Sequence, residues 1–194
     1  MPVETIQAVF LKEVIPHAFF QPDIAFLEFT PRDIARIESH RKSFYRIGDR
    51  SRSMDSMTQF PGPYVWVAGF PQEFVVPNAE VYQEEPVRLV RGGLEVAPDR
   101  YVAGSPFDYL VVRIPSGVDG AAQTYQGVSG AGVWGFYFRH DRKTGEISSE
   151  PPEFALIGVA FHEGPLEKNQ REICCHGAGS IHVTLPGELQ NPQT

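Results

Sequence analysis

Gly, Pro, Asp or Asn interrupts short apolar segments of this sequence about every 10 to 15 residues, and this spacing limits the folds that the chain can adopt. The chain of 194 residues holds 18 glycines and 17 prolines. Segments this short favour strands joined by turns, a rhythm typical of antiparallel barrels and sandwiches. We therefore expect an all-β fold, with strands in the ranges 3–15, 23–29, 64–70, 84–92, 100–104, 107–115, 132–139, 154–164 and 180–186.

One early segment departs from this rhythm. Thr30 suits the capping position of a helix, Pro31 suits the first helical position, and Asp33 places a negative charge in the first turn. The sequence therefore predicts one short helix near residues 31–43.

The charge balance and the cysteines exclude several classes of protein. The net charge is −7, with 24 acidic and 17 basic residues, which gives no electrostatic footprint for DNA or RNA. No apolar run approaches the roughly 18 residues of a membrane span, and the start of the chain lacks a signal-peptide pattern. Cys174 and Cys175 are adjacent and are the only cysteines, so we expect reduced thiols. These features predict a cytoplasmic chain with no nucleic-acid and no membrane partner.

The most informative motif is the glycine-rich run from Tyr125 to Trp134, which contains Ser129. A serine flanked by small residues just before a strand can occupy a sharp turn that exposes its hydroxyl group and directs backbone amides at one point. Acyl transfer by a serine nucleophile requires that arrangement. An ordinary glycine-rich turn fits the motif equally well, so both interpretations stay open. The Gly-x-Ser-x-Gly elbow does not fit, because Gly132 comes one position too late.

Four short motifs, taken together, give the chain a family resemblance. They are Asp-Ile-Ala-Phe-Leu at 23–27, Val-Trp-Val-Ala-Gly-Phe-Pro at 65–71, Gly-Val-Ser-Gly at 127–130 and Leu-Ile-Gly-Val-Ala at 156–160. In order and spacing they resemble the trypsin-like (chymotrypsin-fold) serine peptidases. The resemblance implies a double antiparallel six-stranded β-barrel whose first barrel is incomplete here. Residues 1–75 would form the partial first barrel with the aspartate, and residues 76–194 the second barrel with the serine.

The resemblance also implies catalytic roles in a serine endopeptidase. Ser129 would be the nucleophile, and the backbone N–H groups of Gly127 and Ser129 would form the oxyanion hole. Asp23 would orient a histidine base, although a turn or capping residue after Pro22 is the plain alternative. Val128 stands where zymogen-activated members of the family carry an aspartate, so we expect no activation by N-terminal cleavage.

The same resemblance assigns a substrate cleft for a polypeptide. Phe161, His162 and Glu163 would border this cleft, and Gln123 would lie near its base. Because Gln123 offers no carboxylate, specificity for Lys or Arg is not implied. We expect no cofactor and no metal site, since the run from Cys174 to His176 is too local to surround an ion.

The family's histidine base is the part that this sequence does not supply. The family places it well before the aspartate, whereas only 22 residues precede Asp23 and the sole upstream histidine, His17, is six residues away. Without that base, we expect this chain of 194 residues by itself to be inactive or a very poor peptidase. Two hypotheses follow. Either the sequence starts at an internal methionine and lacks the histidine-bearing strands, so that secretion stays open, or the chain is a non-catalytic, peptidase-like module that binds peptides or proteins. We favour the first, because losing those strands would leave the first barrel with open edges.

Overall fold

The computed structural model describes residues 7–10, 25–39, 44–47, 63–69, 71–74, 89–91, 96–97, 107–118, 121–141 and 143–190. Strands dominate this part of the chain, as the sequence predicts. They are β1 (Gln7–Phe10), β2 (Ala25–Glu28), β3 (Tyr64–Ala68), β4 (Leu89–Arg91), β5 (Val96–Ala97), β6 (Tyr109–Pro115), β7 (Gly132–Tyr137), β8 (Glu153–Glu167) and β9 (Gln170–Gly177). The helical elements are α1 (Pro31–Ser39), η1 (Gln72–Phe74), η2 (Ser180–Thr184) and α3 (Leu185–Gln190).

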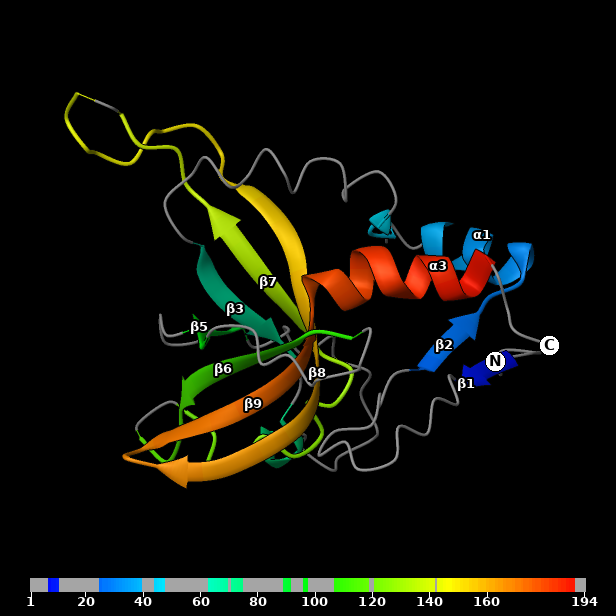
Figure 1. The fold of residues 1–194 in the computed structure, drawn as a ribbon, viewed down its shortest axis with the longest axis horizontal. Coiled ribbons are helices and arrows are strands. Elements are labelled where there is room, and N and C mark those ends of the chain that lie inside the picture. The colour runs from blue at the N-terminus through cyan, green and yellow to red at the C-terminus, as the bar shows by residue number, and fades with distance from the viewer. Residues whose placement is uncertain are drawn as a thin grey trace.

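Seven of the strands form one antiparallel sheet in the order β4-β3-β7-β8-β9-β6-β5. Its central five strands curl into a half-barrel (Figure 1). The two edge strands, β4 and β5, are only four residues apart in the sequence, which limits the gap between them to roughly 18 Å. A flat sheet of seven strands would separate its edges by about 29 Å, so the sheet has to curl.

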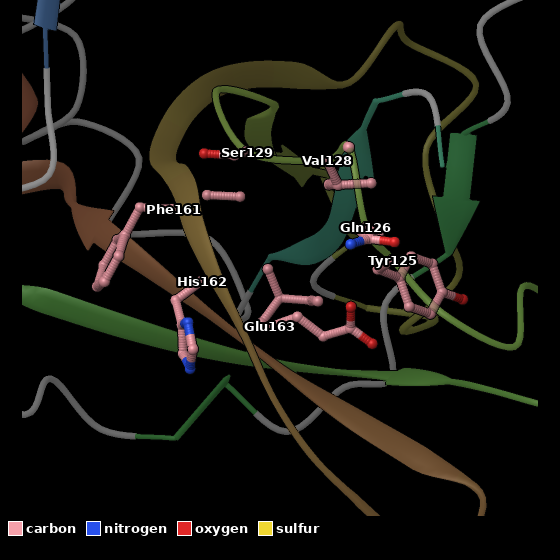
Figure 2. A pocket seen from close by; sticks show the side chains of 10 residues that line it. Tyr125, Gln126, Val128, Ser129, Phe161, His162 and Glu163 are labelled. Atoms are coloured by element: carbon pink, nitrogen blue, oxygen red, sulfur yellow. The ribbon is translucent and has the colours of Figure 1, made fainter. Parts of the chain in front are cut away.

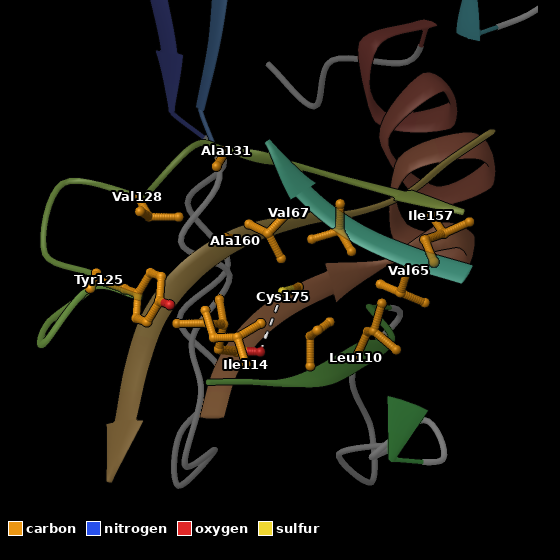
Figure 3. Close-up of a cluster of buried hydrophobic side chains, with 14 of the residues drawn as sticks. Val65, Val67, Leu110, Ile114, Tyr125, Val128, Ala131, Ile157, Ala160 and Cys175 are labelled. Carbon is orange, nitrogen blue, oxygen red and sulfur yellow. Dashed lines mark hydrogen bonds between the residues drawn. The ribbon is translucent and has the colours of Figure 1, made fainter. Parts of the chain in front are cut away.

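The buried face of this sheet follows from alternation along each strand. Val65 and Val67 of β3 are 2% and 1% exposed, whereas the other three residues of this strand, Tyr64, Trp66 and Ala68, are half-buried. These two side chains meet Val133 of β7 and Ile157 of β8 in one cluster of buried hydrophobic residues, which Figure 3 shows between the strands. Burying such a side chain contributes roughly 1.5 to 3 kcal/mol. The cluster therefore holds the half-barrel together.

The long strands β8 and β9 form a hairpin that the sequence analysis misses. Lys168 and Asn169 connect them with φ values of 49° and 61°, as a two-residue turn of a hairpin requires. β9 carries Cys174 and Cys175, which are buried, free cysteines.

The predicted helix exists and begins at Pro31, and the described helix ends at Ser39. The Thr30 hydroxyl group accepts a hydrogen bond from the Asp33 amide (3.2 Å) and donates one to the Asp33 carboxylate (2.6 Å), which caps the first turn. Further along, Tyr45 packs edge-on against Trp134 with ring centroids 5.1 Å apart. This contact fastens the N-terminal part of the chain to the outer face of β7.

The strand predicted at 180–186 is wrong, because this segment is helical in η2 and α3. Ile181 and Leu185, four residues apart, are 2% and 3% exposed, whereas Val183 between them is 72% exposed. That is the spacing of a helix with one buried face. His182 consequently lies on η2 and not on a strand.

Three further expectations concern the domain boundary at residue 75, the position of Asp23 and the strand at 100–104. β3 lies before residue 75, the expected domain boundary, yet it pairs with β7, the strand that follows Ser129. Asp23 and the strand expected at 100–104 lie outside the described residues. Within the described ranges, no helix combines the length and apolar character that crossing a membrane requires.

Candidate functional site

Ser129 lies on a tight turn between β6 and β7, as its glycine-rich surroundings predict. The Val128 amide donates to the Tyr125 carbonyl (3.1 Å) and the Ala131 amide donates to the Val128 carbonyl (2.8 Å). These two bonds close consecutive turns around Ser129, which is exposed. Gly130 in the second turn has a φ of 85°, a conformation that side-chain-bearing residues rarely adopt.

The turn is fixed to the sheet at its C-terminal end. The Gly130 amide donates to the Ala160 carbonyl of β8 (2.7 Å), and the Ala160 amide donates back to the Ala131 carbonyl (2.9 Å). Gly69, after β3, approaches the turn so closely that a Cβ there would lie 2.7 Å from the Ala131 Cβ. Val128 is 3% exposed and belongs to the buried hydrophobic cluster. The position of Ser129 is therefore set by the core of the half-barrel.

Two amide groups of this turn remain unused. Within the described part of the chain, neither the Gly127 amide nor the Ser129 amide donates a hydrogen bond to a backbone acceptor, whereas the amides of Val128 and Gly130 both do. Gly127 and Ser129 are exposed. Both amides therefore lack a backbone acceptor in the described part of the chain, and an oxyanion hole requires N–H groups that are available in this way.

A cavity of about 180 Å³ opens next to this turn (Figure 2). Its walls come from the turn, from β8 and from one residue of β9. The lining residues are Tyr125, Gln126, Gly127, Val128, Ser129, Ala160, Phe161, His162, Glu163 and Ile173. The register of β8 shifts between Ala160 and His162, and such a bulge bends a strand locally. The structure thus brings together five of the residues that the resemblance implies: Gly127, Ser129, Phe161, His162 and Glu163.

Gln123, by contrast, is not among the residues that line the cavity. Its side chain is exposed, and its backbone holds the loop before Tyr125 in place. The Gln123 amide donates to a carboxylate oxygen of Glu73 (2.7 Å), and its carbonyl accepts from the Ser116 hydroxyl group (2.9 Å). Glu73 also accepts from the Thr124 amide (3.2 Å). Sequence reasoning misses Glu73, because no spacing signal links it to a loop 50 positions away.

Glu163 extends its carboxylate toward Tyr125 (Figure 2). Its Oε1 lies 2.9 Å from Nε of Arg171 on β9, and Arg171 is not among the lining residues. Tyr125 is 2% exposed and donates its hydroxyl proton to the Pro115 carbonyl. Burial raises the pKa of Tyr125 above its ordinary value, and the negative charges of Glu73 and Glu163 raise it further. The lining of the cavity therefore includes a neutral phenol and one carboxylate, that of Glu163.

No described histidine is placed as a base for Ser129. His162 lines the cavity, but its ring points away from Ser129 in Figure 2. His176 is fully buried and stacks with Phe161 at a centroid distance of 4.8 Å. His182 bonds through Nε2 to the Leu156 carbonyl (2.8 Å). Within the described residues there is also no cluster of His, Cys, Asp and Glu that could hold a metal ion.

Comparisons with protein-family models, with curated proteins and with solved structures give no match to this chain. The interpretation of the site therefore depends on its own geometry and chemistry.

Proposed function

We propose that this chain carries the nucleophile, Ser129, of a serine endopeptidase of the trypsin-like kind. One observation carries the proposal: the exposed Ser129 hydroxyl group lies at the edge of a cavity beside the two unused amides of Gly127 and Ser129. A peptide held in the cavity would present its carbonyl carbon to Ser129 and its carbonyl oxygen to the amides.

In the proposed reaction the Ser129 Oγ attacks the peptide carbonyl and a base takes its proton. The negative oxygen of the tetrahedral intermediate would accept hydrogen bonds from the two amides, which are held by the surrounding turns. Losing one such donor typically costs about 10² to 10³ in rate. The base is a histidine oriented by Asp23 in this proposal, and no described residue supplies it.

The architecture supports the same proposal. A curled antiparallel sheet with the serine turn leading into one of its central strands suits the second barrel of a double-barrel peptidase. The first barrel would then belong to the residues before β3, where β1, β2 and α1 are described.

A non-catalytic module that binds peptides or proteins is the second candidate function. It is favoured by the lack of a described histidine bonded to Ser129. The cavity and the free amides would serve such a module equally well, because both can bind a peptide without any proton transfer.

A fluorophosphonate probe tests the nucleophile. We expect a slow covalent adduct on Ser129 that is located by mass spectrometry, does not form when the protein is denatured before the probe is added, and is absent in Ser129→Ala. Ser149, an exposed serine on the distant β7–β8 hairpin, is the matched control, and Ser149→Ala should label as fast as the unmodified chain. Labelling of Ser129 no faster than that of Ser149 would refute the peptidase proposal. Saturable peptide binding in that case would support the binding module.

A further inference from the structure

We infer that Glu73, on η1, is a positioning residue of the candidate site: its carboxylate holds the loop at 121–126 and thereby orients the Gly127 amide. The inference rests on the proposed function in one respect, namely that this amide meets the carbonyl oxygen of a bound polypeptide. Glu73 is not among the residues that line the cavity, so it acts on the site through this loop.

The Glu73 carboxylate binds two consecutive amides of the loop. Its Oε1 accepts a hydrogen bond from the Gln123 amide (2.7 Å), and its Oε2 accepts one from the Thr124 amide (3.2 Å). Hydrogen bonds to an ionised acceptor are shorter and stronger than those between neutral groups. Because each carboxylate oxygen holds a different amide, the two bonds fix the orientation of this part of the loop as well as its distance from η1.

A second contact from η1 reaches the residue before Gly127. The Gln72 amide donates a hydrogen bond to the Gln126 carbonyl (2.7 Å). The Gln126 carbonyl and the Gly127 N–H group belong to one peptide unit, which is planar and trans, so they point in opposite directions. The bond from Gln72 therefore sets the direction of the Gly127 N–H group, and Glu73, the next residue of η1, keeps η1 against the loop.

Core packing does not hold the loop where η1 binds it. Gln123, Gln126 and Gly127 are exposed, whereas Tyr125 between them is 2% exposed. The Tyr125 hydroxyl group donates to the Pro115 carbonyl and ties the other side of the loop to the end of β6. The part of the loop that leads into Gly127 thus depends on hydrogen bonds, and η1 supplies three of those described.

The Ser129 amide is oriented in a different way and serves as an internal comparison. Its peptide unit includes the Val128 carbonyl, which accepts a hydrogen bond from the Ala131 amide (2.8 Å). Val128 is 3% exposed and belongs to the buried hydrophobic cluster. The core and the turn itself therefore hold this second amide. Loss of the Glu73 carboxylate should move the Gly127 amide more than the Ser129 amide.

Amide NMR spectra of the full chain test the inference without relying on catalysis. We expect Glu73→Ala to shift the Gly127 amide resonance strongly and the Ser129 resonance less. Asp141→Ala is the matched control, because the exposed Asp141 carboxylate also accepts hydrogen bonds from two loop amides (2.7 and 3.2 Å), on the distant β7–β8 hairpin; it should leave both resonances in place. A Gly127 resonance that is unchanged in Glu73→Ala, or that moves equally in both variants, overturns the inference.

Rescue by a free carboxylate separates positioning from a general loss of structure. Sodium formate should return the Gly127 resonance of Glu73→Ala toward its position in the unmodified chain, because formate offers the two acceptor oxygens that the variant lacks. Sodium chloride at equal ionic strength should not. Equal recovery with both salts would overturn the role of the carboxylate. Glu73→Gln keeps the size of the side chain but replaces one acceptor oxygen by a donor NH₂ group, so it should shift the Gly127 resonance as well.

The two proposals fail in different ways. With both in force, Glu73→Ala should slow fluorophosphonate labelling of Ser129 by about tenfold to a hundredfold, and Asp141→Ala should label as fast as the unmodified chain. A shift of the Gly127 resonance without labelling of Ser129 in any chain would refute the peptidase and keep Glu73 as a positioning residue. Equal labelling of Ser129 in all three chains, with an unmoved Gly127 resonance, would keep the peptidase and refute the role of Glu73.

Discussion

Two glycine-containing segments contact the curled sheet: the turn at Ser129 and the junction between β9 and η2. Their backbone amide groups differ in hydrogen bonding. At the junction, buried Asp108 accepts hydrogen bonds from the amides of Gly179 (3.1 Å) and Ser180 through its carboxylate and from the Gly177 amide (3.0 Å) through its carbonyl. The Asp108 amide in turn donates to the Ser180 hydroxyl group (2.9 Å). At the turn, the amides of Gly127 and Ser129 have no described backbone acceptor.

This difference separates a segment that stabilises the fold from one that can bind a ligand. Buried amides are nearly always bonded within the protein, since an unmet one costs roughly 1 to 3 kcal/mol. The junction obeys this rule and uses Asp108 as the cap of a helix 72 positions away. The turn leaves its two amides at exposed positions next to a cavity, where water can satisfy them until a ligand replaces it.

The largest effect is expected at the junction. Asp108→Ala removes the acceptors for two amides and for the Ser180 hydroxyl group, and it should lower the free energy of unfolding by about 3 kcal/mol. Asp141 also accepts hydrogen bonds from two amides, those of Lys143 and Thr144, but in an exposed loop. Asp141→Ala should therefore cost no more than about 1 kcal/mol. Chemical denaturation of both variants measures the difference, and equal losses would contradict the contrast between the two environments.

A second experiment perturbs the turn through Gly69, which packs against Val128 and Ala131. Gly69→Ala would place a Cβ 2.7 Å from the Ala131 Cβ and 3.2 Å from Cγ1 of Val128. We expect a loss of about 2 kcal/mol in unfolding free energy, together with slower fluorophosphonate labelling, because Val128 and Ala131 flank Ser129. Gly187 in α3 has no atom within 4 Å of the corresponding position, so Gly187→Ala should be neutral or stabilise by up to about 1 kcal/mol. Unchanged labelling in Gly69→Ala would show that the turn is not held by this contact.

Alkaline pH should lower the free energy of unfolding in two steps, the first caused by Cys175 on β9 and the second by Tyr125 beside the turn. Burial raises the pKa of the Cys175 thiol above 9.0, and burial likewise raises that of Tyr125 above 10.0. A raised folded-state pKa means that the unfolded chain releases the proton first, so stability is constant below about pH 9 and falls as the pH rises. Cys175→Ala should remove the decline that begins near pH 9, and Tyr125→Phe the part that begins near pH 10. Unfolding at pH 8 and at pH 10.5 measures both, and parallel declines in all three chains would exclude these groups as the cause.

The smallest effect is expected at Ser129 itself. Ser129→Ala should change the unfolding free energy by less than about 0.5 kcal/mol, because the side chain is exposed. Ser180→Ala, the same substitution at a fully buried serine bonded to Asp108, should cost about 2 kcal/mol. Thermal unfolding of the two variants compares them. A large loss for Ser129→Ala would assign this serine to the fold and weaken its proposed role as a nucleophile.

Local patterns predicted the elements whose stability comes from nearby residues. The short apolar segment at 64–70 predicted β3, and Thr30, Pro31 and Asp33 predicted the start of α1. The segment 180–186 was misinterpreted because Ile181, Val183 and Leu185 also alternate as in a strand. Its helical form depends on the capping carboxylate of Asp108, which is remote in sequence.

β9 was missed for a related reason. Residues 170–177 mix charged, cysteine and histidine positions, so they lack the β-branched run that marks a strand. Their strand form comes from pairing with β8 on one side and β6 on the other. Asn169, a residue type that tolerates the positive φ of such a turn, was the local signal that could have found this hairpin.

At the candidate site, the local sequence accounts for the turn around Ser129. Glycines around Ser129 permit the backbone conformation that exposes the serine, and this is a local property of the chain. Tertiary contacts account for the rest: they place Glu163 in the cavity wall, keep Gln123 out of it, and bring the Arg171 Nε to 2.9 Å from the Glu163 carboxylate. Such choices depend on which strands curl together and on their register. The register of β8 shifts at the cavity, and a shift of one residue there redirects side chains that no periodicity in the sequence can assign.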